Sequence, residues 1–236
     1  MLPLILAIVF ISLGAISLVF FLSEKTKRYS LKATLIKATC SLLFIATASI
    51  SVRIHSDHVL PLYVLLGLTL GLLGDIFLDF KYVYKEHDKP YSYAGFLMFG
   101  LGHILYISGL FHEFYHGENI LYVILPFVGG IIVALLTIIL EKPMKLKYGE
   151  MKLSCGLYAI TLFSMALSSL SLCIMTSFQN ITLIMFFIGG VLFAVSDLIL
   201  SGTYFGVGKE RPVDIITNAV TYYAAQYLIA FSIYFL

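Results

Sequence analysis

Two aspartates stand inside apolar stretches that are long enough to cross a lipid bilayer. Asp75 lies in the segment LLGDIFLDF, and Asp197 lies in LFAVSDLIL. A carboxyl group is costly to place in hydrocarbon, so an acid at that depth indicates a functional site. If the two groups lie close together, burial and mutual repulsion can keep one protonated while the other is ionised. Such a pair could supply the acid and the base of a proton-transfer reaction.

The amino-acid composition indicates that these two aspartates belong to a membrane protein. Hydrophobic residues make up 60% of the chain and charged residues 12%, and the mean hydropathy is +0.99. These values exclude a soluble domain and are typical of a polytopic membrane protein. The net charge of +2 requires no nucleic-acid partner, because lysines and arginines beside the membrane are expected to meet anionic lipid headgroups.

Eight apolar windows cover nearly the whole chain, and each is close to the ~20 residues that a spanning helix needs. The windows are 2–22, 32–52, 59–79, 91–111, 119–140, 152–174, 181–201 and 213–236. We therefore predict an all-α membrane protein, with one transmembrane domain over 1–236 and eight transmembrane helices. The first window lacks a preceding basic segment, which favours a retained helix over a cleaved signal peptide.

The basic residues predict the orientation. Thirteen of the fifteen lysines and arginines fall in or beside the first, third, fifth and seventh loops. They are Lys25, Lys27, Arg28, Lys32, Lys81, Lys85, Lys89, Lys142, Lys145, Lys147, Lys152, Lys209 and Arg211. Arg53 lies in the other set of loops, and Lys37 lies inside the second window. Because cytoplasmic loops carry the positive charge, we expect these four loops in the cytosol and both termini outside.

Several polar residues share one depth. Counted from the predicted cytosolic ends at about 1.5 Å per residue, four of them lie roughly five residues, or ~8 Å, below the surface. These four are Lys37, Asp75, Asp197 and Asn218. Tyr222 and Gln226 continue the Asn218 stripe at helical spacing, and His103 and Tyr106 form a deeper pair three residues apart. We predict a polar pocket that opens towards the cytosol and also includes Tyr223.

The third and seventh windows resemble each other, LGDIFL against VSDLIL, and the windows that follow continue the likeness. His103 comes 28 residues after Asp75, and Gln226 comes 29 residues after Asp197. This spacing predicts a four-plus-four parallel repeat, in which a site lies between the halves.

Structural roles remain open for most of these residues. Lys37 could extend to the headgroups, and Asp79 is expected to be a solvated helix end. His103, Asn218 and Gln226 could be hydrogen-bonding contacts between helices, and the tyrosines could be packing or interface residues. We assign the apolar walls of the pocket to four phenylalanines, namely Phe77, Phe96, Phe99 and Phe193.

The chain resembles the YhhN family of multipass membrane proteins, whose animal members are lysoplasmalogenases. Four segments carry the resemblance, in the same order and at similar spacing. They are GDIFL from Gly74, FLMFGLGHILY from Phe96, GGVLFAVSDLIL from Gly189 and TYYAAQYLIA from Thr221. The family also has a lysine comparable to Lys37 early in its second helix. Asp79 is not part of the family pattern, and some bacterial members replace the second acid or the glutamine.

The resemblance implies hydrolysis of the vinyl ether bond of a lysoplasmalogen, which yields a fatty aldehyde and glycerophosphoethanolamine or glycerophosphocholine. A vinyl ether is hydrolysed through protonation of its outer carbon, so an acid and a stabilising base are needed. Asp75 and Asp197 suit these roles, and either could be the acid. His103, Tyr106, Tyr223 and Gln226 would orient water or glycerol hydroxyls, and Lys37 would meet the phosphate.

The sequence contains no glycine-rich nucleotide motif, no nucleophile elbow and no metal-binding motif, so we expect no cofactor. The resemblance implies an integral protein of a bacterial cell membrane, or of the endoplasmic reticulum in a eukaryote. Two other classes stay open. Intramembrane acids, a histidine and repeated halves also suit a proton-coupled transporter, and a structural membrane module would use the same polar residues as contacts between helices.

Overall fold

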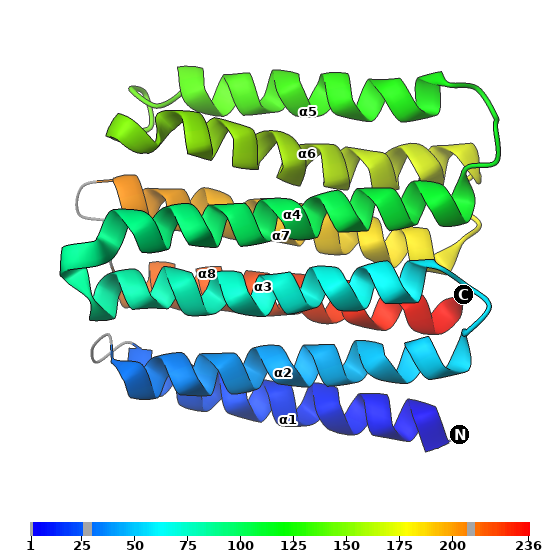
Figure 1. Ribbon diagram of the computed structural model, residues 1–236, viewed down its shortest axis with the longest axis horizontal. Helices are drawn as coiled ribbons and strands as arrows, with labels where there is room; N and C mark the ends of the chain where they lie inside the picture. The colour runs from blue at the N-terminus through cyan, green and yellow to red at the C-terminus, as the bar shows by residue number, and fades with distance from the viewer. Residues whose placement is uncertain (1, 26–29, 207–210) are drawn as a thin grey trace.

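The computed structural model describes residues 2–25, 30–206 and 211–236, which form a bundle of long, roughly parallel helices (Figure 1). The eight α-helices are α1 (Leu2–Lys25), α2 (Leu31–Ile54), α3 (Leu60–Val83), α4 (Asp88–Phe114), α5 (Leu121–Ile139), α6 (Lys152–Met175), α7 (Ile181–Phe205) and α8 (Pro212–Ser232). Short 3-10 turns cover Lys85–His87, Gly149–Met151 and Ile233–Phe235. The described residues contain no strand, although Leu146 and Gly206 form an isolated antiparallel bridge.

Local signals fix where several helices begin. The Ser30 hydroxyl accepts a hydrogen bond from the Ala33 amide at the start of α2, and the Asn180 side chain does the same for Leu183 at the start of α7. Proline stands in the first turn of α3 and of α8, where its missing N–H costs no helical hydrogen bond. Polar caps at the ends and apolar residues between them therefore produce spans of bilayer length.

Seven of the eight α-helices in the described chain are long and apolar enough to cross a membrane, so the protein is a multipass membrane protein. The remaining helix is α8, which is long enough but too polar. Its polar side chains face inward: Tyr222, Tyr223 and Gln226 are buried. Its contacts with α2, α3 and α7 place it among the other helices. That α8 completes eight spans stays a prediction.

The two halves of the chain pack in the same order. Contacts join α1 with α2, α2 with α3, and α3 with α4, as they join α5 with α6, α6 with α7, and α7 with α8. Contacts between the halves correspond too, since α4 meets α6 and α8 meets α2. In Figure 1, α1 and α5 lie at opposite edges of the bundle. This is the pattern that the four-plus-four repeat predicts, and superposition of the halves about one axis would test it.

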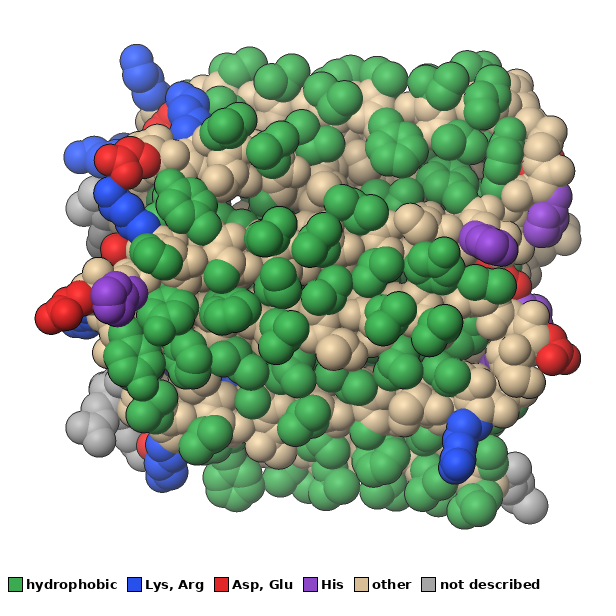
Figure 2. All heavy atoms as spheres, in the orientation of Figure 1, with side chains coloured by type: hydrophobic (Ala, Val, Ile, Leu, Met, Phe, Trp, Pro, Cys, Tyr) green, Lys and Arg blue, Asp and Glu red, His purple; other side chains and the backbone are tan. Residues whose placement is uncertain are grey.

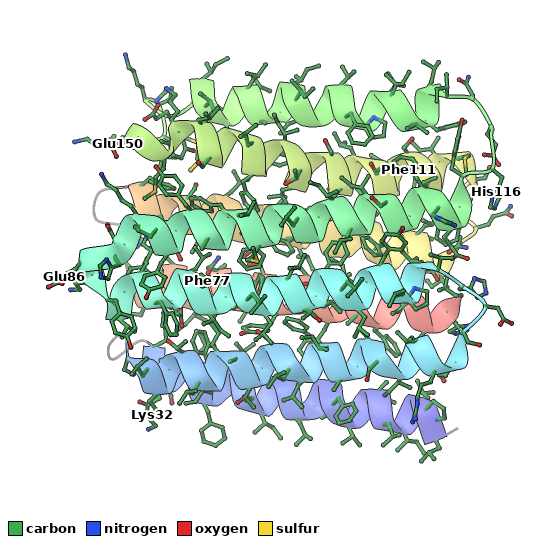
Figure 3. All side chains as sticks on the ribbon, in the orientation of Figure 1. Lys32, Phe77, Glu86, Phe111, His116 and Glu150 are labelled. Carbon is green, nitrogen blue, oxygen red and sulfur yellow. The ribbon has the colours of Figure 1, made fainter. Side chains whose placement is uncertain are left out.

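The charged residues gather at the two ends of the bundle, and most of the visible lysines and arginines lie at one of them (Figure 2). Lys32, Glu86 and Glu150 lie at this basic end, and His116 lies at the opposite end (Figure 3). Both chain termini are also at the opposite end. Of the residues expected in the basic loops, Lys27, Arg28 and Lys209 lie outside the described parts of the chain.

Candidate active site

Asp75 lies in α3 with both carboxylate oxygens occupied. Lys37 Nζ of α2 is 3.1 Å from Oδ1, while the hydroxyls of Ser41 and Tyr222 donate hydrogen bonds to Oδ2 at 2.7 and 2.8 Å. The residue is 2% exposed. A buried carboxylate with a cation and two donors around it is stabilised in its ionised form. Side chains of α2 and α8 therefore hold the Asp75 carboxyl group in place.

Asp79 lies one turn further along α3, and the expectation that it is a solvated helix end is wrong. It is 3% exposed, and its Oδ1 lies 2.7 Å from Lys25 Nζ of α1 and 3.6 Å from Lys37 Nζ. The four-residue spacing places Asp79 on the same inward face of α3 as Asp75. Lys37 therefore meets two carboxylates and is not directed towards the headgroups.

Asp197 lies in α7 and has a different environment. The Tyr158 hydroxyl of α6 donates a hydrogen bond to Oδ2 of Asp197. Within the described chain, no lysine or arginine forms an ion pair with this carboxyl group. Asp197 is half-buried and lines a cavity. Its carboxyl group is thus more accessible than that of Asp75.

One cavity of about 150 Å³ joins these residues. The residues that the sequence places at one depth all line it, namely Lys37, Asp75, Asp197 and Asn218. Tyr222 and Tyr223 line it as well, as do Phe96 and Phe99 among the expected apolar walls. Phe77 and Phe193 are not among its lining residues, so their assignment to the walls is wrong. Its remaining walls are largely apolar and come from α1, α3 and α8 as well as from α5, α6 and α7.

Residues of α8 connect the two halves of the site. Asn218 Nδ2 donates to the Ser196 carbonyl at 2.8 Å, beside Asp197. Gln226 Nε2 donates to the Tyr222 hydroxyl oxygen at 3.0 Å, and Tyr222 in turn donates to Asp75. The chain from Gln226 to Asp75 fixes the orientation of the Tyr222 hydroxyl.

His103 and Tyr106 of α4 lie behind the cavity rather than on its wall. The His103 ring centroid is 5.5 Å from that of Tyr158 and 4.9 Å from that of Phe193. Both residues are buried, and neither the two ring nitrogens nor the Tyr106 hydroxyl has a hydrogen-bond partner in the described structure. Buried polar atoms of this kind are commonly satisfied by internal water. His103 adjoins the site through Tyr158.

Sequence reasoning missed three residues that touch the carboxyl groups: Lys25, Ser41 and Tyr158. The sequence places Lys25 in a basic loop, but α1 continues three residues beyond its predicted end and brings this lysine beside Asp79. Ser41 is four residues after Lys37 and so shares its helix face. Tyr158 is one of sixteen tyrosines, so its residue type alone does not single it out. The predicted repeat could have indicated it, because Tyr158 occupies the position in α6 that Lys37 occupies in α2.

A segment between α5 and α6, residues 140–151, lies at the basic end of the cavity. The Lys147 amide donates to the Phe205 carbonyl at 2.9 Å, and Tyr148 lines the cavity. Glu141 binds Lys152 Nζ at 2.7 Å and accepts from the Tyr148 amide at 3.0 Å. The Lys152 ammonium and that amide lower the pKa of the Glu141 carboxyl, while burial raises the pKa of Tyr148. Glu141 thus holds this segment against α6.

The site therefore offers three carboxyl groups, tyrosine hydroxyls and two lysines in a mostly apolar cavity. Among the described residues, no group of three or more histidines, cysteines, aspartates or glutamates is arranged to hold a metal ion. That the protein uses no cofactor stays a prediction. The arrangement can donate a proton, stabilise a developing positive charge and shield a reaction from bulk water.

The comparisons with known proteins give one match. No curated protein and no solved structure is significantly similar to the chain. The model of the YhhN family matches residues 32–233, a range that includes every carboxyl and tyrosine residue described above as lining the cavity. The resemblance predicted from the sequence is confirmed, and the chain belongs to the YhhN family.

Proposed function

We propose that the protein is a membrane-embedded lysoplasmalogenase, which hydrolyses the vinyl ether bond of a lysoplasmalogen. The observation that carries the proposal is the placement of Asp75 and Asp197, from corresponding helices of the two halves, on one enclosed cavity within the membrane-spanning bundle. Membership of the YhhN family supports it. The products would be a fatty aldehyde and glycerophosphoethanolamine or glycerophosphocholine.

The chemistry requires one proton donor and one stabilising carboxylate. A protonated carboxyl group gives its proton to the outer alkene carbon, whose double-bond electrons form the new C–H bond. The oxocarbenium ion that results is stabilised by the ionised carboxylate, as in glycosidases. Water then adds to the charged carbon and returns a proton to the donor. The hemiacetal breaks its C–O bond to glycerol, the glycerol oxygen takes the hydroxyl proton, and the aldehyde leaves.

The cavity suits a lipid with one chain. Ala159, Leu162 and Phe163 of α6 supply an apolar wall. Leu198 of α7 lines the cavity and is 42% exposed, so the cavity reaches the surface of a membrane-spanning helix there. We assign this side to the alkenyl chain. The glycerophosphate would lie towards the basic end, where Tyr148 and the two lysines are found.

The basic end of the bundle is assigned to the cytosol, because cytoplasmic loops of membrane proteins carry an excess of lysine and arginine. The substrate would then enter from the cytosolic leaflet. Asn218 and Tyr223, which line the cavity, are assigned to orienting water or glycerol hydroxyls there. Lys37 is assigned to Asp75, which it contacts, rather than to the phosphate.

Aldehyde release tests the proposal. Purified protein in detergent is supplied with lysoplasmalogens bearing choline or ethanolamine headgroups, and the aldehyde and the glycerophosphodiester are quantified together. Equal amounts of both products from wild type support the hydrolase, and the rate should fall as pH rises through the apparent pKa of the proton donor. Absence of aldehyde at every pH and headgroup, from protein that is folded, would reject it. Proton-coupled solute flux in proteoliposomes would then favour a transporter.

A further inference from the structure

The two aspartates occupy equivalent positions in the two halves. Asp75 lies eight residues before Val83, the last residue of α3, and Asp197 lies eight residues before Phe205, the last residue of α7. Their partners are equivalent as well. Lys37 comes six residues after the start of α2, and Tyr158 comes six residues after the start of α6. One aspartate thus faces an ammonium where the other faces a neutral hydroxyl.

The charges on the cavity wall show what this difference does. Two lysines and three aspartates line the cavity, namely Lys25, Lys37, Asp75, Asp79 and Asp197. Lys25 pairs with Asp79, and Lys37 contacts both Asp75 and Asp79. Two cations therefore balance two carboxylates. A third ionised carboxylate would give the buried cluster a net negative charge, which is costly in a membrane interior.

We infer that Asp197, hydrogen-bonded to Tyr158, is the proton donor of the reaction, and that Asp75, held by Lys37, Ser41 and Tyr222, is the fixed carboxylate. Asp197 lines the cavity and is less buried than Asp75, as a group that must reach the alkene carbon has to be. Tyr158 is a positioning residue, because it contacts the donor rather than the reacting atoms. This assignment rests on the proposed function.

The other titratable groups on the cavity wall do not change the assignment of Asp197 as the proton donor. The other titratable groups on the cavity wall are Lys25 from α1, Lys37 from α2, Asp75, Asp79 and Tyr82 from α3, Tyr148 before α6, Cys155 and Tyr158 from α6, Tyr204 from α7, and Tyr222 and Tyr223 from α8. The described wall residues of α4 and α5 are Phe96, Phe99, Thr137 and Ile138, which do not titrate. His103 reaches the site across the Tyr158 ring.

Infrared spectroscopy of the purified protein in detergent at neutral pH tests the assignment without any substrate. A protonated carboxyl group has a C=O stretching band that a carboxylate lacks. We expect this band in wild type, and we expect Asp197→Asn to lose it. Persistence of the band in Asp197→Asn would overturn the assignment. Monodisperse elution and an unchanged thermal midpoint select the variants that are folded.

Tyr158→Phe tests the positioning role. Removing the hydroxyl should shift the Asp197 band to higher frequency and lower kcat by about tenfold, the size expected for one hydrogen bond. Tyr93→Phe is the matched control, since Tyr93 is an exposed tyrosine of α4 that does not line the cavity. An unshifted band in Tyr158→Phe would remove Tyr158 from the assignment.

The two claims fail separately. If wild type releases no aldehyde, the proposed hydrolase fails, while the infrared band still reports which aspartate carries a proton. If wild type releases aldehyde but the band belongs to Asp75, the hydrolase stands and the division of roles is reversed. For a working hydrolase, Asp197→Asn should lose at least a hundredfold in kcat, as expected for removal of a general acid.

Discussion

Lys25 and Asp79 join α1 to the centre of the bundle through an ion pair of 2.7 Å between Nζ and Oδ1. Both side chains are almost fully buried, at 10% and 4% exposed. Since α1 otherwise packs mainly on α2, this pair fixes its basic end against α3. It also closes one side of the cavity, which both residues line.

Breaking this pair should be costly. Asp79→Leu removes the carboxylate that Lys25 contacts and should lower the free energy of unfolding by about 3–5 kcal/mol. Lys25→Met should cost less, because Lys37 still lies 3.6 Å from Asp79. Because the double variant leaves neither partner unpaired, its loss should be smaller than the sum of the single losses. Unfolding in detergent measures all three, with Lys32→Met, at an exposed pair with Glu24, as the control. Additive losses would show that the two residues do not depend on each other.

Gly74 provides the space for a ring of the cavity wall. A methyl group at this position would lie 2.6 Å from a ring carbon of Phe99, which packs edge-on against Tyr222 at a centroid distance of 6.1 Å. Gly74→Ala should therefore destabilise the protein by about 1–3 kcal/mol through overpacking. Gly156→Ala is the control, because its nearest neighbours would be 3.9 Å away. Equal thermal midpoints for the two variants would contradict this packing.

Ala159 tests the path assigned to the alkenyl chain. It lies on the apolar wall of α6, one residue after Tyr158. Ala159→Phe should lower kcat/KM at least about tenfold for long-chain substrates, since a misplaced substrate loses much of its reactivity. Leu157→Phe, on the exposed face of the same helix, should leave kcat/KM unchanged. Similar kinetics for the two variants would place the chain elsewhere.

Protonation of Glu141 should loosen the segment 140–151 at the basic end of the cavity. Its pKa is lowered in the folded protein by Lys152 and by the Tyr148 amide, so the ionised form contributes stability. That contribution is present above the ordinary glutamate pKa of about 4.3 and is lost as pH falls through the folded value. Hydrogen exchange over residues 140–151, corrected for the intrinsic effect of pH on exchange, should therefore rise as pH falls below about 4.3. The increase should be smaller in Glu141→Gln, and an equal increase in both proteins would exclude Glu141 as its source.

Much of the fold follows from hydropathy, because an apolar run of bilayer length can satisfy its backbone only as a helix. Each predicted window overlaps one observed helix, from 2–22 against Leu2–Lys25 to 213–236 against Pro212–Ser232. The ends were harder to predict, because the helices that carry Lys25 and Asp79 continue past the apolar residues. In the sequence, a charged residue that forms an ion pair inside the bundle cannot be told from one that marks the end of a membrane-spanning helix.

The site was predictable in depth but less so in its contacts. The rise per residue of an α-helix predicts the depth of a side chain in the membrane. It places four residues at one depth, and all four line the cavity, namely Lys37, Asp75, Asp197 and Asn218. It does not give the rotation of each helix, which decides that Lys37 meets Asp75 and that His103 lies behind Tyr158. Those contacts depend on packing between halves of the chain that are far apart in sequence.

Hydrolysis of a lysoplasmalogen in D₂O by wild type, Asp75→Asn and Asp197→Asn tests whether this pair of aspartates protonates the vinyl ether carbon. Wild type should release an aldehyde with a single deuterium on the carbon next to the carbonyl, because the donor protonates that carbon. Both variants should release it at least about a hundredfold more slowly. Aldehyde without that deuterium, or wild-type rates from either folded variant, would contradict carbon protonation by this pair of aspartates.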